Sequence, residues 1–97
     1  MLIKAGVDIS RLKPEIRKKL NKIESIISAI LGEEMIVTST YEGTHSPGSL
    51  HYADWAVDIR SINKRSAVWG EIKRYLGDDY DVCLESKHIH IEYDPPI

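Results

Sequence analysis

Hydrophobic residues recur at steps of three and four from about Lys13 to Leu31, which is typical of a helix that lies on a core. The stripe consists of Leu12, Ile16, Leu20, Ile23, Ile27 and Ile30. Pro14 suits the first turn of this helix, where its missing N–H group is not needed, and Ser10 or Lys13 would lie in the capping region. Gly32 is well placed to end it. One helix is therefore predicted over this segment.

A second helical pattern spans about Lys64 to Leu76. Its inner side would consist of Val68, Ile72, Tyr75 and Leu76. Asn63 or Ser61 can cap the start of this helix, because a short polar side chain accepts a hydrogen bond from a free backbone N–H group. Gly77 and the two aspartates that follow it would end the helix.

Strand-forming residues predict four strands, separated by segments that are rich in turn-forming residues. The strands are expected at about Met35–Thr40, Trp55–Ile59, Tyr80–Leu84 and Lys87–Tyr93. Residues 41–51 are dense in Gly, Ser and Pro and predict a structured loop, and a tight turn near Ser86 would join the last two strands. This order of elements predicts an α+β fold, with a mainly antiparallel sheet and two principal helices packed on it.

Length and composition limit the possible classes of protein. Residues 1–97 are expected to form a single domain, because 97 residues leave no room for a second one. The 42% of hydrophobic and 29% of charged residues are typical of a globular chain and not of a disordered one. A formal net charge of −2 gives no general basic field to attract nucleic acid, and no apolar run approaches the roughly 18 residues of a membrane span. A monomer is expected.

Four further features of the sequence add expectations. Cys83 is the one cysteine, so an internal disulfide is excluded, and with no Phe the aromatic part of the core is expected from Trp55, Trp69 and the tyrosines. The first residues lack the long apolar region of a signal peptide, which predicts synthesis in the cytoplasm; action at the cell wall would need another route of export. One face of the first predicted helix is basic and consists of Arg17, Lys18, Lys19 and Lys22. Such a face is either solvated or binds a polyanion such as an anionic cell-wall polymer.

The histidines and two carboxylates carry the candidate chemistry. The histidines form two clusters, His45 with His51 in the predicted loop and His88 with His90 in the last strand. The second pair alternates with isoleucines, so both imidazoles would project from one face of the sheet. Asp58 lies within an apolar strand, where a carboxylate must be paired, hydrogen-bonded or bound to a metal, and Glu85 lies five residues before His90.

Each of these residues also has an ordinary explanation, such as a surface position for His51, a salt bridge from Asp58 to Arg60, or a solvated Glu85. Taken together, two histidines and one carboxylate supply three ligands and leave a fourth tetrahedral position for water, which is the composition of a catalytic zinc site. A further Glu can serve as general base, and a further His can stabilise charge on a substrate oxygen. Spacing alone leaves both explanations open.

Two segments make the chain resemble a known family. Residues 49–58, Ser-Leu-His-Tyr-Ala-Asp-Trp-Ala-Val-Asp, are followed by residues 85–90, Glu-Ser-Lys-His-Ile-His. They are similar to the zinc D-alanyl-D-alanine carboxypeptidases and their L-alanyl-D-glutamate and D,D-endopeptidase relatives, whose pattern is Ser-x-His-x-x-Gly-x-Ala-x-Asp with a later His-x-His. The chain resembles even more closely the amino-terminal signalling domain of hedgehog proteins, through Ser-Leu-His-Tyr, Ala-Val-Asp-Ile, Glu-Ser-Lys and His-Ile-His. The likeness runs from about Gly6 to Tyr93.

The resemblance implies the shared fold of these proteins and a zinc ion (Zn2+) on His51, Asp58 and His90. It assigns the catalytic base to Glu85 and the second active-site histidine to His88. His45 corresponds to a hedgehog histidine six residues before the first ligand, and it would lie near the metal without binding it. The implied substrates are peptidoglycan peptides, and the small size resembles the stand-alone peptidases of bacteriophages and prophages.

The sequence departs from the family pattern at three places. Asp54 replaces the family Gly, next to the expected metal site. Glu42 stands where many family enzymes have an Arg that holds a substrate carboxylate, which favours an endopeptidase over a carboxypeptidase. Glu85 and His88 are one residue closer together than in hedgehog proteins, as in the peptidases. Hedgehog domains also bind calcium through an acidic cluster that has no counterpart here beyond Asp8 and Glu42, so calcium is not expected.

Three hypotheses follow. The first is a zinc metallopeptidase that cuts stem or cross-bridge peptides of peptidoglycan. The second is a hedgehog-like binding module that holds zinc without turnover. The third is a purely structural zinc domain, which needs a fourth protein ligand. Cys83 is the one thiol that could supply this ligand, although the simpler interpretation is that Cys83 is a small buried residue.

Overall fold

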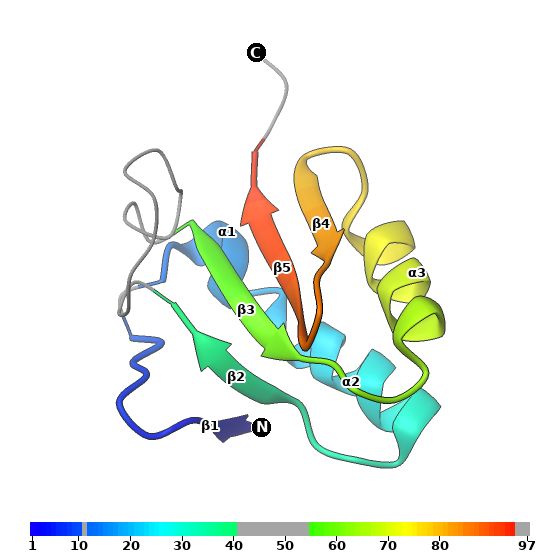
Figure 1. Cartoon of the computed structure of the whole chain (residues 1–97). Coiled ribbons are helices and arrows are strands. Elements are labelled where there is room, and N and C mark those ends of the chain that lie inside the picture. Colours follow the sequence, from blue (N-terminus) through cyan, green and yellow to red (C-terminus); the bar gives the residue numbers. More distant parts are fainter. Residues whose placement is uncertain (11, 41–54, 95–97) are drawn as a thin grey trace.

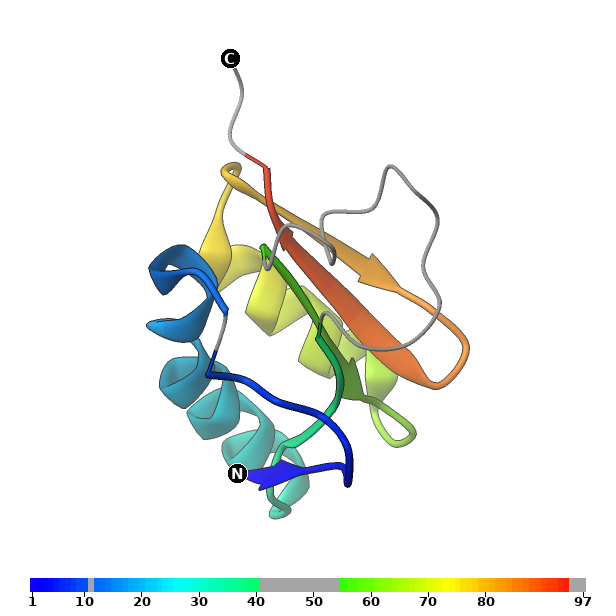
Figure 2. The same ribbon diagram turned by 90° about the vertical axis from the view of Figure 1, so that its left-hand side faces the viewer.

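In the described part of the chain, five strands form one sheet, and the helices pack against one of its faces (Figures 1 and 2). The computed structural model describes residues 1–10, 12–40 and 55–94. The strands are β1 (Leu2–Ile3), β2 (Ile36–Ser39), β3 (Ala56–Arg60), β4 (Tyr80–Leu84) and β5 (His88–Tyr93). Their order across the sheet is β1-β2-β3-β5-β4, and every neighbouring pair is antiparallel except β1 with β2. The predicted α+β class with a mainly antiparallel sheet is confirmed.

The first predicted helix consists of two pieces, α1 (Pro14–Arg17) and α2 (Leu20–Leu31). The helix is interrupted between them, where the Lys19 N–H donates to the Ile16 carbonyl oxygen at 3.0 Å, a tighter bond than the usual bond to the fourth preceding residue. The apolar stripe still passes through the break, because Ile16 and Leu20 are both 1% exposed. The predicted end at Gly32 is confirmed, since its φ of 68° is the left-handed conformation that glycine adopts without strain.

The second principal helix, α3 (Arg65–Leu76), begins differently from the prediction. Lys64 occupies the capping position with a φ of 47°, and no side chain caps the helix, so the predicted caps at Ser61 and Asn63 are wrong. Val68, Ile72 and Leu76 are buried as predicted. Tyr75 is exposed instead, because its ring lies at the margin of the helix layer, where the ammonium group of Lys19 is 5.1 Å from the ring centroid.

The core between sheet and helices follows the alternation of the strands. Val57 and Ile59 of β3 are fully buried, and Ile89 and Ile91 of β5 are at most 1% exposed. Each such side chain contributes roughly 1.5–3 kcal/mol by leaving water. The prediction of an aromatic core is wrong for the described residues, where the buried cluster is aliphatic apart from Met35 and the aromatic rings lie at its edge.

The short strand β1 was not predicted. Two residues are too few to show an alternating pattern, and both are exposed at the edge of the sheet. The strand is held by backbone bonds, including the Leu2 N–H to the Met35 carbonyl oxygen at 2.8 Å. No helix in the described part of the chain is both long and apolar enough to span a membrane.

Candidate metal centre

The register between β3 and β5 places Asp58 directly beside His90. The two residues are Cα partners in the antiparallel pair, and Arg60 is the partner of His88. Since their neighbours Ile59 and Ile89 point into the core, these four side chains project from the sheet face that the helices leave uncovered. The predicted common face of the two histidines is therefore present.

His90 lies between two carboxylates. Its Nδ1 is 2.7 Å from Oδ1 of Asp58, and its Nε2 is 2.5 Å from Oε1 of Glu92. Burial alone would lower the pKa of His90, but the hydrogen bonds to Asp58 and then to Glu92 outweigh it and raise this pKa to about 9. In the metal-free protein at neutral pH, His90 is thus an imidazolium that donates a hydrogen bond to each carboxylate.

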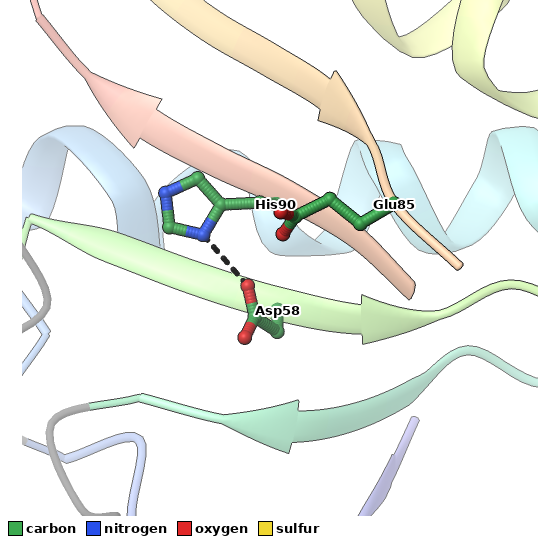
Figure 3. A group of neighbouring side chains, drawn as sticks. All are labelled: Asp58, Glu85 and His90. Atoms are coloured by element: carbon green, nitrogen blue, oxygen red, sulfur yellow. Dashed lines mark hydrogen bonds and ion pairs between the residues drawn. The ribbon is translucent and has the colours of Figure 1, made fainter. Parts of the chain in front are cut away.

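Glu85 enters the site from the turn between β4 and β5. Its backbone N–H donates to the His88 carbonyl oxygen at 2.9 Å, and its carbonyl oxygen accepts a hydrogen bond from the guanidinium of Arg65 on α3. These bonds hold the turn so that the Glu85 carboxylate points back toward His90 and Asp58 (Figure 3). One potential ligand atom from each of Asp58, Glu85 and His90 lies within 4.8 Å of the other two. The three residues form a group that could hold a metal ion.

His88 connects two members of this group. Its Nε2 is 2.9 Å from Oε1 of Glu85 and 3.6 Å from Oδ2 of Asp58. Its side chain is 33% exposed, whereas that of Asp58 is 11% exposed. His88 therefore faces solvent at the rim of the group, where a bound molecule would meet it.

The chemistry of the donor atoms fits zinc. Imidazole nitrogen and carboxylate oxygen are among its usual ligands, at about 2.0–2.2 Å, so tetrahedral ligand atoms lie about 3.3 Å from one another. Asp58 Oδ1 and His90 Nδ1 are 2.7 Å apart, so these two atoms must move apart by about half an ångström when a metal replaces the proton that they share. Glu92 on the other ring nitrogen has the position of the outer carboxylate that typically orients a metal-binding histidine.

The structure brings together four of the six predicted site residues, namely Asp58, Glu85, His88 and His90. His45 and His51 lie outside the described residues. Cys83 is the Cα partner of His90 on β4, but its sulfur is 3.6 Å from Oδ1 of Asp81 and it does not join the metal-binding group. Burial first, and then the Asp81 carboxylate, raises the pKa of the Cys83 thiol.

Two residues of the site were missed by the sequence analysis. Glu92 could have been found, because it continues the alternation of His88 and His90 by one more step on the same strand. Arg65 could not, since nothing in the sequence shows which turn its guanidinium reaches.

Comparisons with known proteins give no relative: no model of a protein family matches the chain, and no curated protein sequence matches it. The resemblance to zinc peptidases and hedgehog domains rests on its two short segments. Of the first segment, Asp58 is among the residues that the structure describes, and the second segment is described in full.

Proposed function

We propose that this chain is a zinc-dependent hydrolase that cleaves peptide bonds in the stem or cross-bridge peptides of peptidoglycan. One observation carries the proposal: Asp58, Glu85 and His90 converge on the sheet face opposite the helices, with His88 bonded to Glu85 at the rim of the group. The family resemblance supplies the substrate class and the nature of the bond.

Asp58 and His90 would hold the zinc ion, together with His51 by the resemblance. When bound, zinc lowers the pKa of a water ligand toward ~7 and polarises a carbonyl group. Glu92 fixes the ring of His90 through Nε2, so that Nδ1 stays directed at Asp58.

Glu85 would act as general base and then as general acid. Its side chain is half exposed, so an attacking water can reach it, and the Arg65 bond to its own carbonyl group fixes the backbone that carries it. The carboxylate takes a proton from the attacking water and passes it to the leaving amine. The imidazole of His88 lies beside Glu85 at the rim, and from there a ring N–H group would donate to the developing oxyanion of the substrate.

One observation favours a second candidate, the hedgehog-like zinc-binding module without turnover. Glu85 is itself a member of the metal-binding group. If Glu85 binds zinc together with Asp58, His90 and His51, the ion has four protein ligands and no position for water, which is typical of a structural site.

The substitution Glu85→Gln separates the two candidates, because it keeps shape and removes basicity. If Glu85 acts as the base, it is dispensable for zinc binding, so the variant keeps one zinc per chain while its cleavage of muropeptides falls by about 10²–10⁴-fold. If Glu85 is instead a zinc ligand, the substitution weakens zinc binding. Glu33→Gln, at an exposed glutamate remote from the site, is the matched control and should change neither.

The assay incubates zinc-loaded protein with purified muropeptides of both common chemotypes and identifies products by mass spectrometry. Wild-type protein with full zinc that cleaves none of them contradicts the hydrolase and leaves the binding module. Equal cleavage by wild type and Glu85→Gln would retain the hydrolase and reject Glu85 as its base.

A further inference from the structure

A groove of about 780 Å³ lies on the sheet face opposite the helices, beside the metal-binding group. Asp58 and His88 form part of its lining, and four of its other lining residues are the cations Lys4, Arg60, Arg65 and Lys87. This volume is within the range of about 300–1,000 Å³ that is usual for ligand sites. The groove therefore connects the candidate centre to a surface whose charged side chains, apart from Asp58, are cations.

Among the described residues, the cations of the groove have no carboxylate partner. Within residues 1–10, 12–40 and 55–94, Lys4, Arg60 and Lys87 form no ion pair. The guanidinium of Arg65 donates to the Glu85 carbonyl oxygen, and its Nε is buried without a partner among the same residues. The chain has 15 acidic and 13 basic residues, so this gathering does not reflect a general excess of positive charge.

Resting on the function proposed above, we propose that this groove is a carboxylate-binding subsite, and that the protein prefers peptides with an acidic residue close to the cleaved bond. Arg60 would be the main partner, since a guanidinium matches a carboxylate with two parallel hydrogen bonds, and Lys87 would add a second charge.

The strand geometry sets the distance between subsite and centre. Arg60 follows Asp58 by two residues on the same face of β3 and pairs with His88 across β5. Two strand residues span about 6.6–7 Å, which is also the length of about two residues of an extended peptide. The acidic residue is therefore expected within about two residues of the cleaved bond.

The neighbouring acidic side chains select a short ligand. Asp58 lines the groove, Glu85 directly precedes the lining residue Ser86, and Glu92 and Asp81 are paired on β5 and β4. A long polyanion laid across this face would meet all of these carboxylates, whereas a single peptide carboxylate held by Arg60 and Lys87 would meet only Asp58 among them in the lining of the groove.

The test uses two peptidoglycan stem peptides that differ in one group, a free or an amidated α-carboxylate on the glutamate residue. Wild-type protein should show a kcat/KM about tenfold higher for the free acid, as expected for a charge-assisted hydrogen bond. Arg60→Gln should remove this preference and Arg60→Lys should retain part of it. Lys18→Gln, at an exposed lysine at the end of α1, is the charge-matched control and should keep it in full.

Binding of the same two peptides to the zinc-loaded Glu85→Gln variant, followed by NMR, gives a second measurement that needs no turnover. Equal kcat/KM and equal affinity for both peptides would overturn the subsite and leave the hydrolase intact. Preferential binding of the free acid without cleavage by wild type would keep the subsite and overturn the hydrolase. Circular dichroism of each variant checks that its fold is retained.

Discussion

The position of His90 between two carboxylates predicts how the stability of the metal-free protein changes with pH. The pKa of His90 is about 9 in the folded protein, against 6.5 for an ordinary histidine. The folded state therefore holds the proton more tightly than the unfolded chain. The resulting stabilisation is fully present below about pH 6.5, declines as the pH rises, and is lost above about pH 9.

The expected magnitude is about 3 kcal/mol, because a pKa difference of one corresponds to about 1.36 kcal/mol. A domain of this size is typically stable by only 5–15 kcal/mol, so the loss is easily measured. Urea unfolding in the presence of a chelator, followed by circular dichroism at pH 6 and pH 10, gives the free energy of unfolding at each pH.

Other groups titrate in the same range, including the amino group of Met1, whose pKa is raised by its bond to Glu24. His90→Gln keeps these groups and removes the imidazole, so the stability difference between wild type and this variant isolates the effect of His90. That difference should shrink by about 3 kcal/mol between pH 6 and pH 10. A difference that stays constant, or imidazole NMR signals of His90 that titrate near pH 6.5, would refute the reasoning.

Four further predictions concern the metal, the substrate and the core. Zinc at 100 times its Kd should add about 2.7 kcal/mol, which raises the Tm in a thermal scan by over 10 °C, and a chelator should reverse the increase. Glu92→Ala should lower zinc affinity by about 10- to 100-fold in a competition titration, while Asp94→Ala should not. Ile72→Ala should cost 2–5 kcal/mol in urea unfolding, against less than about 0.5 kcal/mol for Ile62→Ala, because Ile72 is fully buried and Ile62 is 53% exposed. His45→Ala should leave the zinc content unchanged by elemental analysis but reduce muropeptide cleavage; loss of zinc would instead make His45 a ligand.

Much of the fold could be predicted because local patterns and tertiary packing agree. The range predicted for β4, Tyr80–Leu84, is the observed one, and the alternation in β5 sorted Ile89 and Ile91 into the core. Where they disagree, packing decides. Tyr75 has the spacing of a buried residue, yet α3 turns it to the edge of the helix layer, where two lysines cover its ring.

Four residues of the described site could be predicted from the sequence, namely Asp58, Glu85, His88 and His90, but their contacts could not. Which strands become neighbours is decided by long-range packing, and β3 pairs with β5 although β4 comes first along the chain. That pairing brings Asp58 to His90. The position of Lys64 at a φ of 47° and the bond from Arg65 to the Glu85 carbonyl oxygen are equally absent from any local pattern, because they depend on how α3 meets the β4–β5 turn.

The strict alternation of β5 restricts how this protein can change in length. His88, His90 and Glu92 face the candidate centre while Ile89 and Ile91 face the core, so inserting or deleting one residue within the strand would exchange the two sets. Such a change would turn the polar side chains of His88, His90 and Glu92 toward the core and expose two isoleucines at once. Insertions and deletions of single residues are therefore expected only in the connecting segments, whereas within β5 the residues of the candidate centre can change only by substitution.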